Sequence, residues 1–283
     1  MAAIVLLAAC GDSAGSDADT AVGSHGKSAA ATSSAVPGTK GTQPKGSQTE
    51  GPQTKGSGSA KPTEERQADG PPGKAAPAPR APRLRPGQIP GLGSLTRGRI
   101  PADARQALVV TGDSYDSSLS TAVLYTRDAP GGGWRAVTPR WEAHNGLNGW
   151  ADKHWENDLR TPVGIYGLTA AGGLFAPPNT VFPYEQDPAY SVSGEGFDGE
   201  PLEGSFDYVV AIDYNRTPGV SPLDRERPLG QERGGGIWLH VDHGGPTQGC
   251  VSLSENHMRE LLRLLDPRKN PVVVMGDAGW LEG

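Results

Sequence analysis

The second half of this 283-residue sequence predicts a mainly β, β-sandwich-like domain with one late α-helix, preceded by a long disordered N-terminal region. Short runs rich in Val, Ile, Leu and Tyr alternate with turns that contain Gly and Pro, which is typical of paired strands. One segment near the C-terminus has apolar residues at helical spacing. The first hundred residues contain few large apolar side chains, so they cannot bury enough surface to offset the entropy of ordering.

The expected strands share a β-prone composition and are bounded by turns, and they occupy residues 107–111, 121–126, 134–137, 207–214, 237–241 and 271–275. The expected helix begins after Ser254, a typical N-cap, and ends before Pro267. Its apolar face would consist of Met258, Leu261, Leu262 and Leu265.

The first ten residues form an apolar run that ends in Leu7-Ala8-Ala9-Cys10. An aliphatic residue, two small residues and a cysteine form the pattern of a bacterial lipoprotein signal, in which the cysteine is lipidated. No basic segment precedes the run, so we expect the true start codon to lie further upstream. An ordinary short apolar N-terminus is the alternative. We interpret residues 1–10 as a truncated signal that ends at the lipidated Cys10.

Residues 11–100 consist largely of Gly, Ser, Ala, Thr, Pro and Lys. A flexible coil of about 90 residues spans roughly 50 Å, and its prolines extend it further. We interpret this segment as a tether that holds a folded domain, residues 101–283, away from a membrane. A linker without a spacing role fits the composition equally well.

The charge of the chain is unevenly distributed. The net charge is −6 overall, and residues 101–283 carry about −11. A nucleic-acid-binding domain needs a basic face, so this balance argues against nucleic acid as a partner.

The residues with the most chemical content lie between Gly234 and Leu253. A buried strand is expected to end near His240, and a Gly-containing loop then leads to Gly249 and Cys250. A histidine at a strand end with a cysteine on the next turn suits nucleophilic thiol chemistry, because the imidazole accepts the proton and the thiolate attacks. Backbone N–H groups at Gly249 and Cys250 are candidates for binding an oxyanion.

Alternatives exist for these assignments. His243 is a rival base to His240, because it also precedes the loop. Asp242 is interpreted as a solvated loop charge, with the orientation of an imidazole as the alternative, and His144 as a surface or turn residue. Cysteine is also common as a small buried apolar residue, so a structural Cys250 is the alternative to a nucleophile.

A metal site is a further possibility at this stretch. His240, His243 and Cys250 offer three possible zinc ligands. Nothing nearby resembles the activating glutamate or the supporting acid that such sites use. We therefore expect no metal and no other cofactor.

The segment from Thr247 to Val251 resembles the catalytic segment of the L,D-transpeptidase (YkuD-type) family, whose usual core is Ser/Thr-His-Gly-Cys followed by a β-branched residue and Arg. The sequence departs from this core at Gln248, where the family usually has His, and at Ser252, where it often has Arg. The gap between the strand histidine and the cysteine is also shorter than in the commonest members.

A second stretch, residues 153–166, resembles the family's Lys…Glu-Gly-Asp-Gly-x-Thr-Pro-x-Gly-x-Phe segment. The matching positions are Glu156, Asp158, Thr161, Pro162 and Gly164. The Thr-Pro pair fixes an extended start to a strand, and the glycine allows close backbone contact. Residues 145–150 are similar to the family's Gly-rich turn, and residues 213–215 lie between the two matches.

The resemblance implies an L,D-transpeptidase catalytic fold and a cysteine-dependent acyltransferase. Cys250 would attack the L,D peptide bond of a tetrapeptide stem in peptidoglycan and release the terminal D-Ala, with His240 as base and then acid. An amine of a neighbouring stem, a protein or water would resolve the thioester. Substrate contacts are assigned to Thr247, Gln248, Trp238 and Tyr214, with core packing as the alternative for the tryptophan.

These inferences predict a lipid-anchored monomer on the outer face of a bacterial cytoplasmic membrane, reaching into the cell wall and acting on peptidoglycan stem peptides. The alternative is a catalytically weak peptidoglycan-binding lipoprotein, in which the departures at Gln248 and Ser252 mark a lost activity. The acceptor, and the balance between transfer and hydrolysis, are left open by the sequence.

Overall fold

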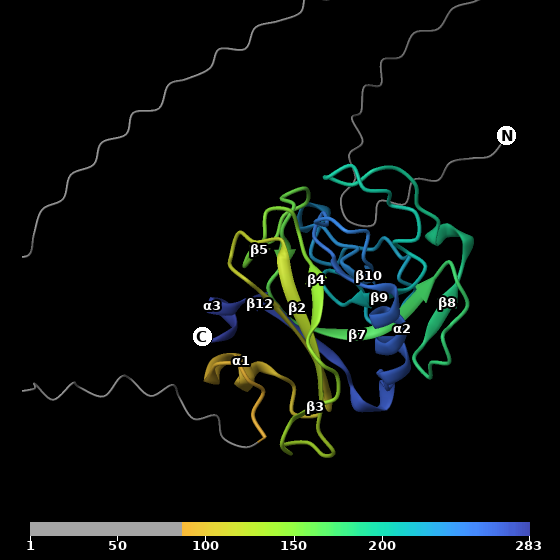
Figure 1. The fold of residues 1–283 in the computed structure, drawn as a ribbon. Helices are drawn as coiled ribbons and strands as arrows, with labels where there is room; N and C mark the ends of the chain where they lie inside the picture. The colour runs from red at the N-terminus through yellow and green to blue at the C-terminus, as the bar shows by residue number, and fades with distance from the viewer. Residues whose placement is uncertain (1–86) are drawn as a thin grey trace, which may run out of the picture. The chain divides into compact units, whose positions relative to one another are not determined.

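The computed structural model describes residues 87–283 (Figure 1). The predicted signal, its Cys10 and most of the predicted tether lie outside the described residues. Within residues 87–283, no helix is long and apolar enough to cross a membrane. The described part is mainly β, as the sequence predicts.

The strands of the structure are β1 (Gln106–Gly112), β2 (Leu119–Thr126), β3 (Arg135–Ala136), β4 (Trp141–His144), β5 (Trp150–Ala151), β6 (Thr161–Pro162), β7 (Gly164–Gly173), β8 (Tyr184–Gln186), β9 (Val209–Ile212), β10 (Trp238–Val241), β11 (Val251–Leu253) and β12 (Val272–Asp277). The α-helices are α1 (Ser94–Arg99), α2 (Glu255–Leu264) and α3 (Ala278–Leu281). Short 3-10 turns occur at η1 (Pro188–Tyr190), η2 (Gln231–Arg233) and η3 (Pro267–Lys269).

Ten strands form one sheet that closes on itself. Its order is β1-β12-β7-β9-β10-β11-β4-β2, and β2 pairs with β1 to complete the ring. β3 pairs with β2 and β8 pairs with β7, outside the ring. The predicted sandwich-like arrangement thus takes the form of a barrel-like sheet around one interior, and closure removes exposed edges from the strands in the ring.

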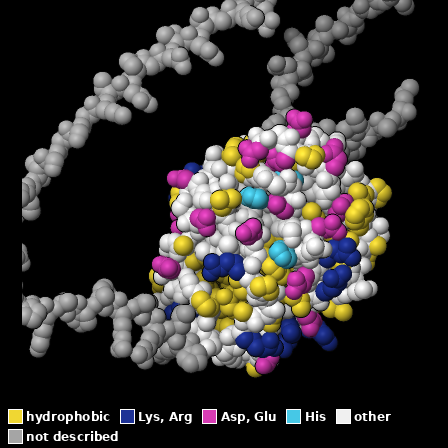
Figure 2. Space-filling model, in the orientation of Figure 1, with side chains coloured by type: hydrophobic (Ala, Val, Ile, Leu, Met, Phe, Trp, Pro, Cys, Tyr) yellow, Lys and Arg dark blue, Asp and Glu magenta, His cyan; other side chains and the backbone are white. Residues whose placement is uncertain are grey.

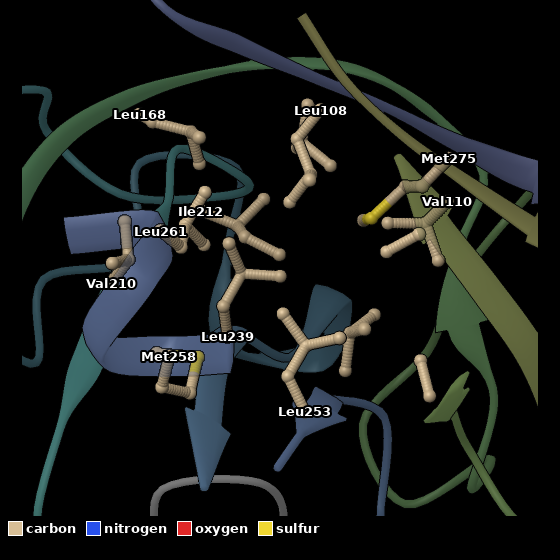
Figure 3. Close-up of a cluster of buried hydrophobic side chains, with 14 of the residues drawn as sticks. Leu108, Val110, Leu168, Val210, Ile212, Leu239, Leu253, Met258, Leu261 and Met275 are labelled. Atoms are coloured by element: carbon tan, nitrogen blue, oxygen red, sulfur yellow. The ribbon is translucent and has the colours of Figure 1, made fainter. Parts of the chain in front are cut away.

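The largest cluster of buried side chains fills this interior (Figure 3). Alternate residues of the ring strands point into it, among them Leu108 of β1, Leu239 of β10 and Leu253 of β11. α2 adds its apolar stripe, in which Met258 and Leu261 are fully buried. Truncating such a residue to alanine typically costs roughly 2–5 kcal/mol.

The predicted late helix is confirmed as α2. The hydroxyl of Ser254 accepts the backbone N–H of His257 at 3.3 Å, as expected of an N-cap. The helix ends at Leu264, before Pro267. Two further short helices, α1 and α3, were not predicted, because helices of six and four residues carry no periodic signal.

Residues 87–100 belong to the fold, so the predicted domain boundary at residue 101 is too late. Ile89, Leu92 and Ile100 are buried on the outer side of β1 and β12, together with Leu281 of α3. The backbone N–H of Gly93 also donates to the Leu281 carbonyl at 2.8 Å. α1 and α3 accordingly lie together in Figure 1. Isolated apolar residues in a Gly- and Pro-rich segment give no pattern, and here tertiary packing alone buries them.

Candidate active site

Three neighbouring strands place predicted and unpredicted polar residues in one row. β10 and β11 run parallel, and their register sets His240 opposite Ser252. β11 and β4 run antiparallel and set Ser252 opposite His144. Leu239 and Val251, which alternate with these residues, face the interior cluster. The row therefore lies on the outer face of the sheet.

Cys250 directly precedes β11 and, by the register of Leu239 with Val251, lies on the outer face, level with Trp238 and one diagonal step from His240. Its side chain is fully buried in a cluster that includes Tyr190 and Phe206. The backbone N–H of Trp238 donates to its Sγ at 3.3 Å. The same Sγ lies 3.7 Å from the carbonyl oxygen of Gly236, to which a thiol donates.

The turn before Cys250 is held by two threonine hydroxyls. The Oγ1 of Thr247 donates to the Cys250 carbonyl at 2.7 Å, and the Oγ1 of Thr161 donates to the same oxygen at 3.3 Å. Gly249 has a φ of 152°, and a Cβ there would lie 3.0 Å from the Arg160 carbonyl oxygen. The two matched segments of the sequence thus meet at the cysteine.

The backbone N–H of Gly249, which is predicted to bind an oxyanion, is already engaged in this conformation. It donates to the Oγ1 of Thr247 at 3.1 Å. An oxyanion would therefore have to displace this hydroxyl to use the N–H of Gly249. Thr247 is itself buried, so it shapes the turn, whereas the neighbouring Gln248 is exposed to solvent.

His240 is almost fully buried, with 3% of its surface exposed, and its ring meets Phe206 edge-on. Its Nδ1 lies 2.9 Å from the carbonyl oxygen of Val241. A carbonyl only accepts, so Nδ1 carries the proton and Nε2 is left as an acceptor. Burial lowers the pKa of His240 to about 4, which the nearby His243 reinforces and the bond to Val241 opposes. The imidazole is therefore neutral at pH 7, as a general base must be.

His243 has a different partner. Its Nδ1 lies 2.9 Å from the Oε1 of Glu200, a residue that sequence reasoning missed. The ring of His243 stacks on that of His240, with centroids 5.8 Å apart and planes 8° from parallel. Burial would raise the pKa of Glu200, but hydrogen bonds from backbone N–H groups, including that of Asp198, and from His243 lower it. Glu200 is therefore ionised at neutral pH.

Asp242 is not the solvated loop charge that the sequence suggested. Its Oδ1 accepts the hydroxyl of Ser252 at 2.6 Å and lies 2.8 Å from the Nδ1 of His144. Burial alone would raise the pKa of Asp242, but these two hydrogen bonds lower it to about 2. The same bond to Asp242 raises the pKa of His144. The prediction that His144 is a surface or turn residue was also wrong, because it belongs to β4 and to this network.

The comparison with known families decides what this domain is. Residues 115–274, more than half of the chain, match the model of the L,D-transpeptidase catalytic domain, YkuD. The chain belongs to the L,D-transpeptidase (YkuD) family. No match was found among curated proteins or among solved structures. The matched span contains Cys250, both candidate histidine bases and the threonines that hold the turn.

The side chains of Tyr214 and Trp238, two of the predicted substrate contacts, are packed inside the L,D-transpeptidase domain. The hydroxyl of Tyr214 donates to the Arg233 carbonyl at 2.8 Å, and its ring packs in the interior cluster. The indole of Trp238 packs against Tyr190 and Phe206, as the core-packing alternative predicts. Neither side chain presents a polar atom to Cys250, although the backbone N–H of Trp238 does.

The possible zinc ligands of this L,D-transpeptidase are engaged in other ways. The Nδ1 atoms of His240 and His243 contact a carbonyl and a carboxylate. Within residues 87–283, no group of three or more His, Cys, Asp or Glu side chains is arranged to hold a metal ion.

Proposed function

We propose that this domain is a cysteine-dependent L,D-transpeptidase that works through a thioester on Cys250. The observation that carries this proposal is the placement of Cys250 and His240 on the outer face of two adjacent parallel strands, inside the span that matches the family. Membership of the family supports peptidoglycan stem peptides as the substrate.

In the first step, the Nε2 of His240 accepts the thiol proton and Sγ attacks the carbonyl carbon of the L,D peptide bond. The N–H of Trp238 supports the thiolate until it attacks. Because His240 is buried and its pKa is about 4, its imidazolium is short-lived and readily returns the proton. That proton goes to the leaving D-Ala amine, and a thioester is left on Cys250.

The oxyanion formed during attack needs N–H donors close to Cys250. The backbone N–H groups of Gly249 and Cys250 are the candidates. Rotation of the Thr247 side chain would free the N–H of Gly249 for this role, while the hydroxyl of Thr161 continues to hold the Cys250 carbonyl. In the second step, an amine of a neighbouring stem, a protein or water attacks the thioester.

His240 is the preferred base on geometric grounds. It is the diagonal neighbour of Cys250 on the adjacent strand and its Nε2 is an acceptor. His243 follows the end of β10 and is held by Glu200. We expect His240→Gln to abolish acylation of Cys250 and His243→Gln to leave it largely intact.

The test is intact-mass detection of an acyl adduct on the full chain, kept in a reducing buffer and mixed with a tetrapeptide stem ending in D-Ala. Wild type should gain the mass of the stem minus D-Ala. Cys250→Ser, which has no sulfur at this position, should form no thioester adduct. If His243→Gln, and not His240→Gln, abolishes the adduct, the base assignment is wrong, but the proposal that the domain is a cysteine-dependent enzyme still holds.

The alternative function is a catalytically weak peptidoglycan-binding lipoprotein, suggested by the departures at Gln248 and Ser252. It predicts that wild type forms no adduct with the stem peptide but still sediments with purified peptidoglycan. An adduct that depends on Cys250 excludes this alternative.

The proposed location is the outer face of a bacterial cytoplasmic membrane, with Cys10 lipidated. The sequence Leu7-Ala8-Ala9-Cys10 supports this. Expression behind a complete signal should send wild type into the detergent phase and Cys10→Ala into the aqueous phase. Equal aqueous partitioning of the two would refute the anchor.

A further inference from the structure

The pair formed by Glu200 and His243 is a buried imidazole–carboxylate pair that the mechanism above does not use. The two side chains are 13% and 5% exposed, and Oε1 and Nδ1 are 2.9 Å apart. Within residues 87–283, Glu200 is the only hydrogen-bond partner of the His243 ring. The bond occupies Nδ1, so Nε2 is left to exchange protons.

The surrounding backbone makes room for this carboxylate. A side chain at Gly245 or at Gly196 would collide with the carboxylate of Glu200. The backbone N–H of Asp198 donates to the Oε2 of Glu200 at 2.8 Å, so both carboxylate oxygens are held. Glu200 therefore meets His243 through a fixed geometry and is not a mobile surface charge.

The second half of the reaction needs a base, and His240 is poorly suited to that role. A primary amine keeps its proton until roughly pH 10, so the acceptor arrives as an ammonium ion. Once the thioester has formed, Sγ carries no negative charge beside His240. A second proton on this buried ring would then have no counter-ion, and its pKa is about 4.

We propose that His243 is a second catalytic base, which takes the proton from the acceptor amine, and that Glu200 is its positioning residue. This inference rests on the proposed function. The ring of His243 stacks directly on that of His240, 5.8 Å away, so it borders the same reaction space. Glu200 supplies the counter-charge for the imidazolium that forms, as a carboxylate does in a catalytic triad.

The proton balance of the transfer is complete. The ammonium gives one proton to the Nε2 of His243, and the neutral amine attacks the thioester carbon. The carbon–sulfur bond breaks as the amide forms, and the second amine proton passes through His240 to Sγ, which restores the thiol. His243 then releases its proton to water.

The charges around His243 suit a cationic acceptor. Besides His240 and Glu200, His243 interacts electrostatically with Asp242, which adjoins it in the chain. The loop of residues 191–208 contains acidic residues and no lysine or arginine. Figure 2 shows acidic side chains gathered at the upper end of the molecule, where this loop lies in Figure 1. Such a surface attracts an ammonium ion and repels a carboxylate.

The experiment separates the two half-reactions in the full chain. Acylation is followed by intact mass with the tetrapeptide stem alone, and transfer is followed by adding a stem peptide with a primary side-chain amine. Hydroxylamine is a second acceptor, since it is unprotonated at neutral pH and needs no base. The variants are His243→Gln and Glu200→Gln, with Glu195→Gln as a matched control that removes an exposed acid from the same loop.

We expect His243→Gln to leave acylation within about twofold and to slow transfer to the stem amine by roughly 10²–10⁴-fold. Transfer to hydroxylamine should be unchanged, and the slow transfer should recover as the pH rises toward the pKa of the amine. Glu200→Gln should slow transfer less and shift its pH profile, and Glu195→Gln should change neither step.

Three results would overturn the inference. Unchanged transfer in His243→Gln would show that it is not the base. An equal loss with hydroxylamine, or an equal loss in acylation, would mean that the pair merely holds the 191–208 loop in place. If wild type itself forms no acyl adduct, the proposed function fails first, and that outcome is distinct from these three.

Discussion

Two histidines lie in one row on the outer face of the sheet, on either side of Ser252, and their surroundings shift their pKa values in opposite directions. His240 is buried and its Nδ1 meets only a carbonyl, so its pKa falls to about 4. His144 is one quarter exposed and its Nδ1 meets the carboxylate of Asp242, so its pKa rises. A dry site with a neutral partner lowers the pKa of the imidazole, and a site with an ionised partner raises it.

The hydroxyl of Ser252, which lies between the two histidines, is hydrogen-bonded on one side only. Ser252 donates to Asp242, and it is thereby tied to His144 and not to His240. The row is thus divided into a part next to Cys250, which we propose is catalytic, and a structural part that joins β4, β10 and β11. The following predictions test this division, beginning with the largest expected effect.

Replacing either histidine with glutamine should have very different effects on the chemistry. His240→Gln should slow acylation of Cys250 by roughly 10²–10⁴-fold, because general-base assistance is lost. His144→Gln should slow it no more than a few-fold, because His144 contacts Asp242 and not the cysteine. Intact-mass time courses with the tetrapeptide stem measure both rates. Comparable losses of acylation rate in the two variants would contradict the different roles assigned to the two histidines.

The same two histidines should impose opposite pH dependences on stability. The pKa of His240 is about 4 in the fold against 6.5 in the unfolded chain. The unfolded chain therefore binds the proton first, and the contribution of His240, present in full above about pH 6.5, is lost as the pH falls toward 4. The loss is on the order of 3 kcal/mol. The raised pKa of His144 acts in the other direction, with stability present at low pH and lost as the pH rises through its folded-state pKa.

Urea unfolding of wild type, His240→Gln and His144→Gln between about pH 7.5 and 4.5 measures this difference. Relative to wild type, His240→Gln should lose less stability as the pH falls, and His144→Gln should lose more. Parallel curves for the three proteins would mean that neither pKa differs between the folded and unfolded states.

Much of the site could be predicted because its signals are local. The strand that ends near His240, the glycine before Cys250 and the N-cap at Ser254 are patterns within a few residues. The proposed chemistry follows from residue types at short spacing, and His240 lies on β10 while Cys250 directly precedes the adjacent β11.

The residues that could not be predicted act through distant contacts. Glu200 meets His243 across 43 positions of sequence, and His144 meets Asp242 across 98. A lone acidic residue in a loop carries no local mark of the imidazole that it will contact. The burial of residues 87–100 could not be predicted either, because it depends on the packing of a few apolar side chains on the distant strands β1 and β12.

Removing the charge of Asp242 should weaken the hydrogen bonds that hold the structural part of the row together. Asp242→Asn weakens the bonds to His144 and Ser252, and we expect a loss of roughly 1–3 kcal/mol in the free energy of unfolding. The pKa of His144, followed by NMR, should fall toward 6.5. Glu142→Gln removes an exposed acid on the same strand, whose charge also raises the pKa of His144 but less than Asp242 does, so this variant should lower that pKa by less. An unchanged pKa of His144 in Asp242→Asn would show that another group raises it.

The smallest expected effect is that of Ser252→Ala, and it tests where the division falls. Its hydroxyl is fully buried and makes one hydrogen bond, to Asp242, so its loss should cost about 1 kcal/mol. The pKa of Asp242 should rise from about 2, because one of the two bonds that lower it is gone. Acylation should proceed at nearly the wild-type rate, because the hydroxyl is tied to Asp242 and makes no hydrogen bond to His240. If Ser252→Ala instead slows acylation as strongly as His240→Gln, then Ser252 belongs to the catalytic part, and the two histidines are coupled through it.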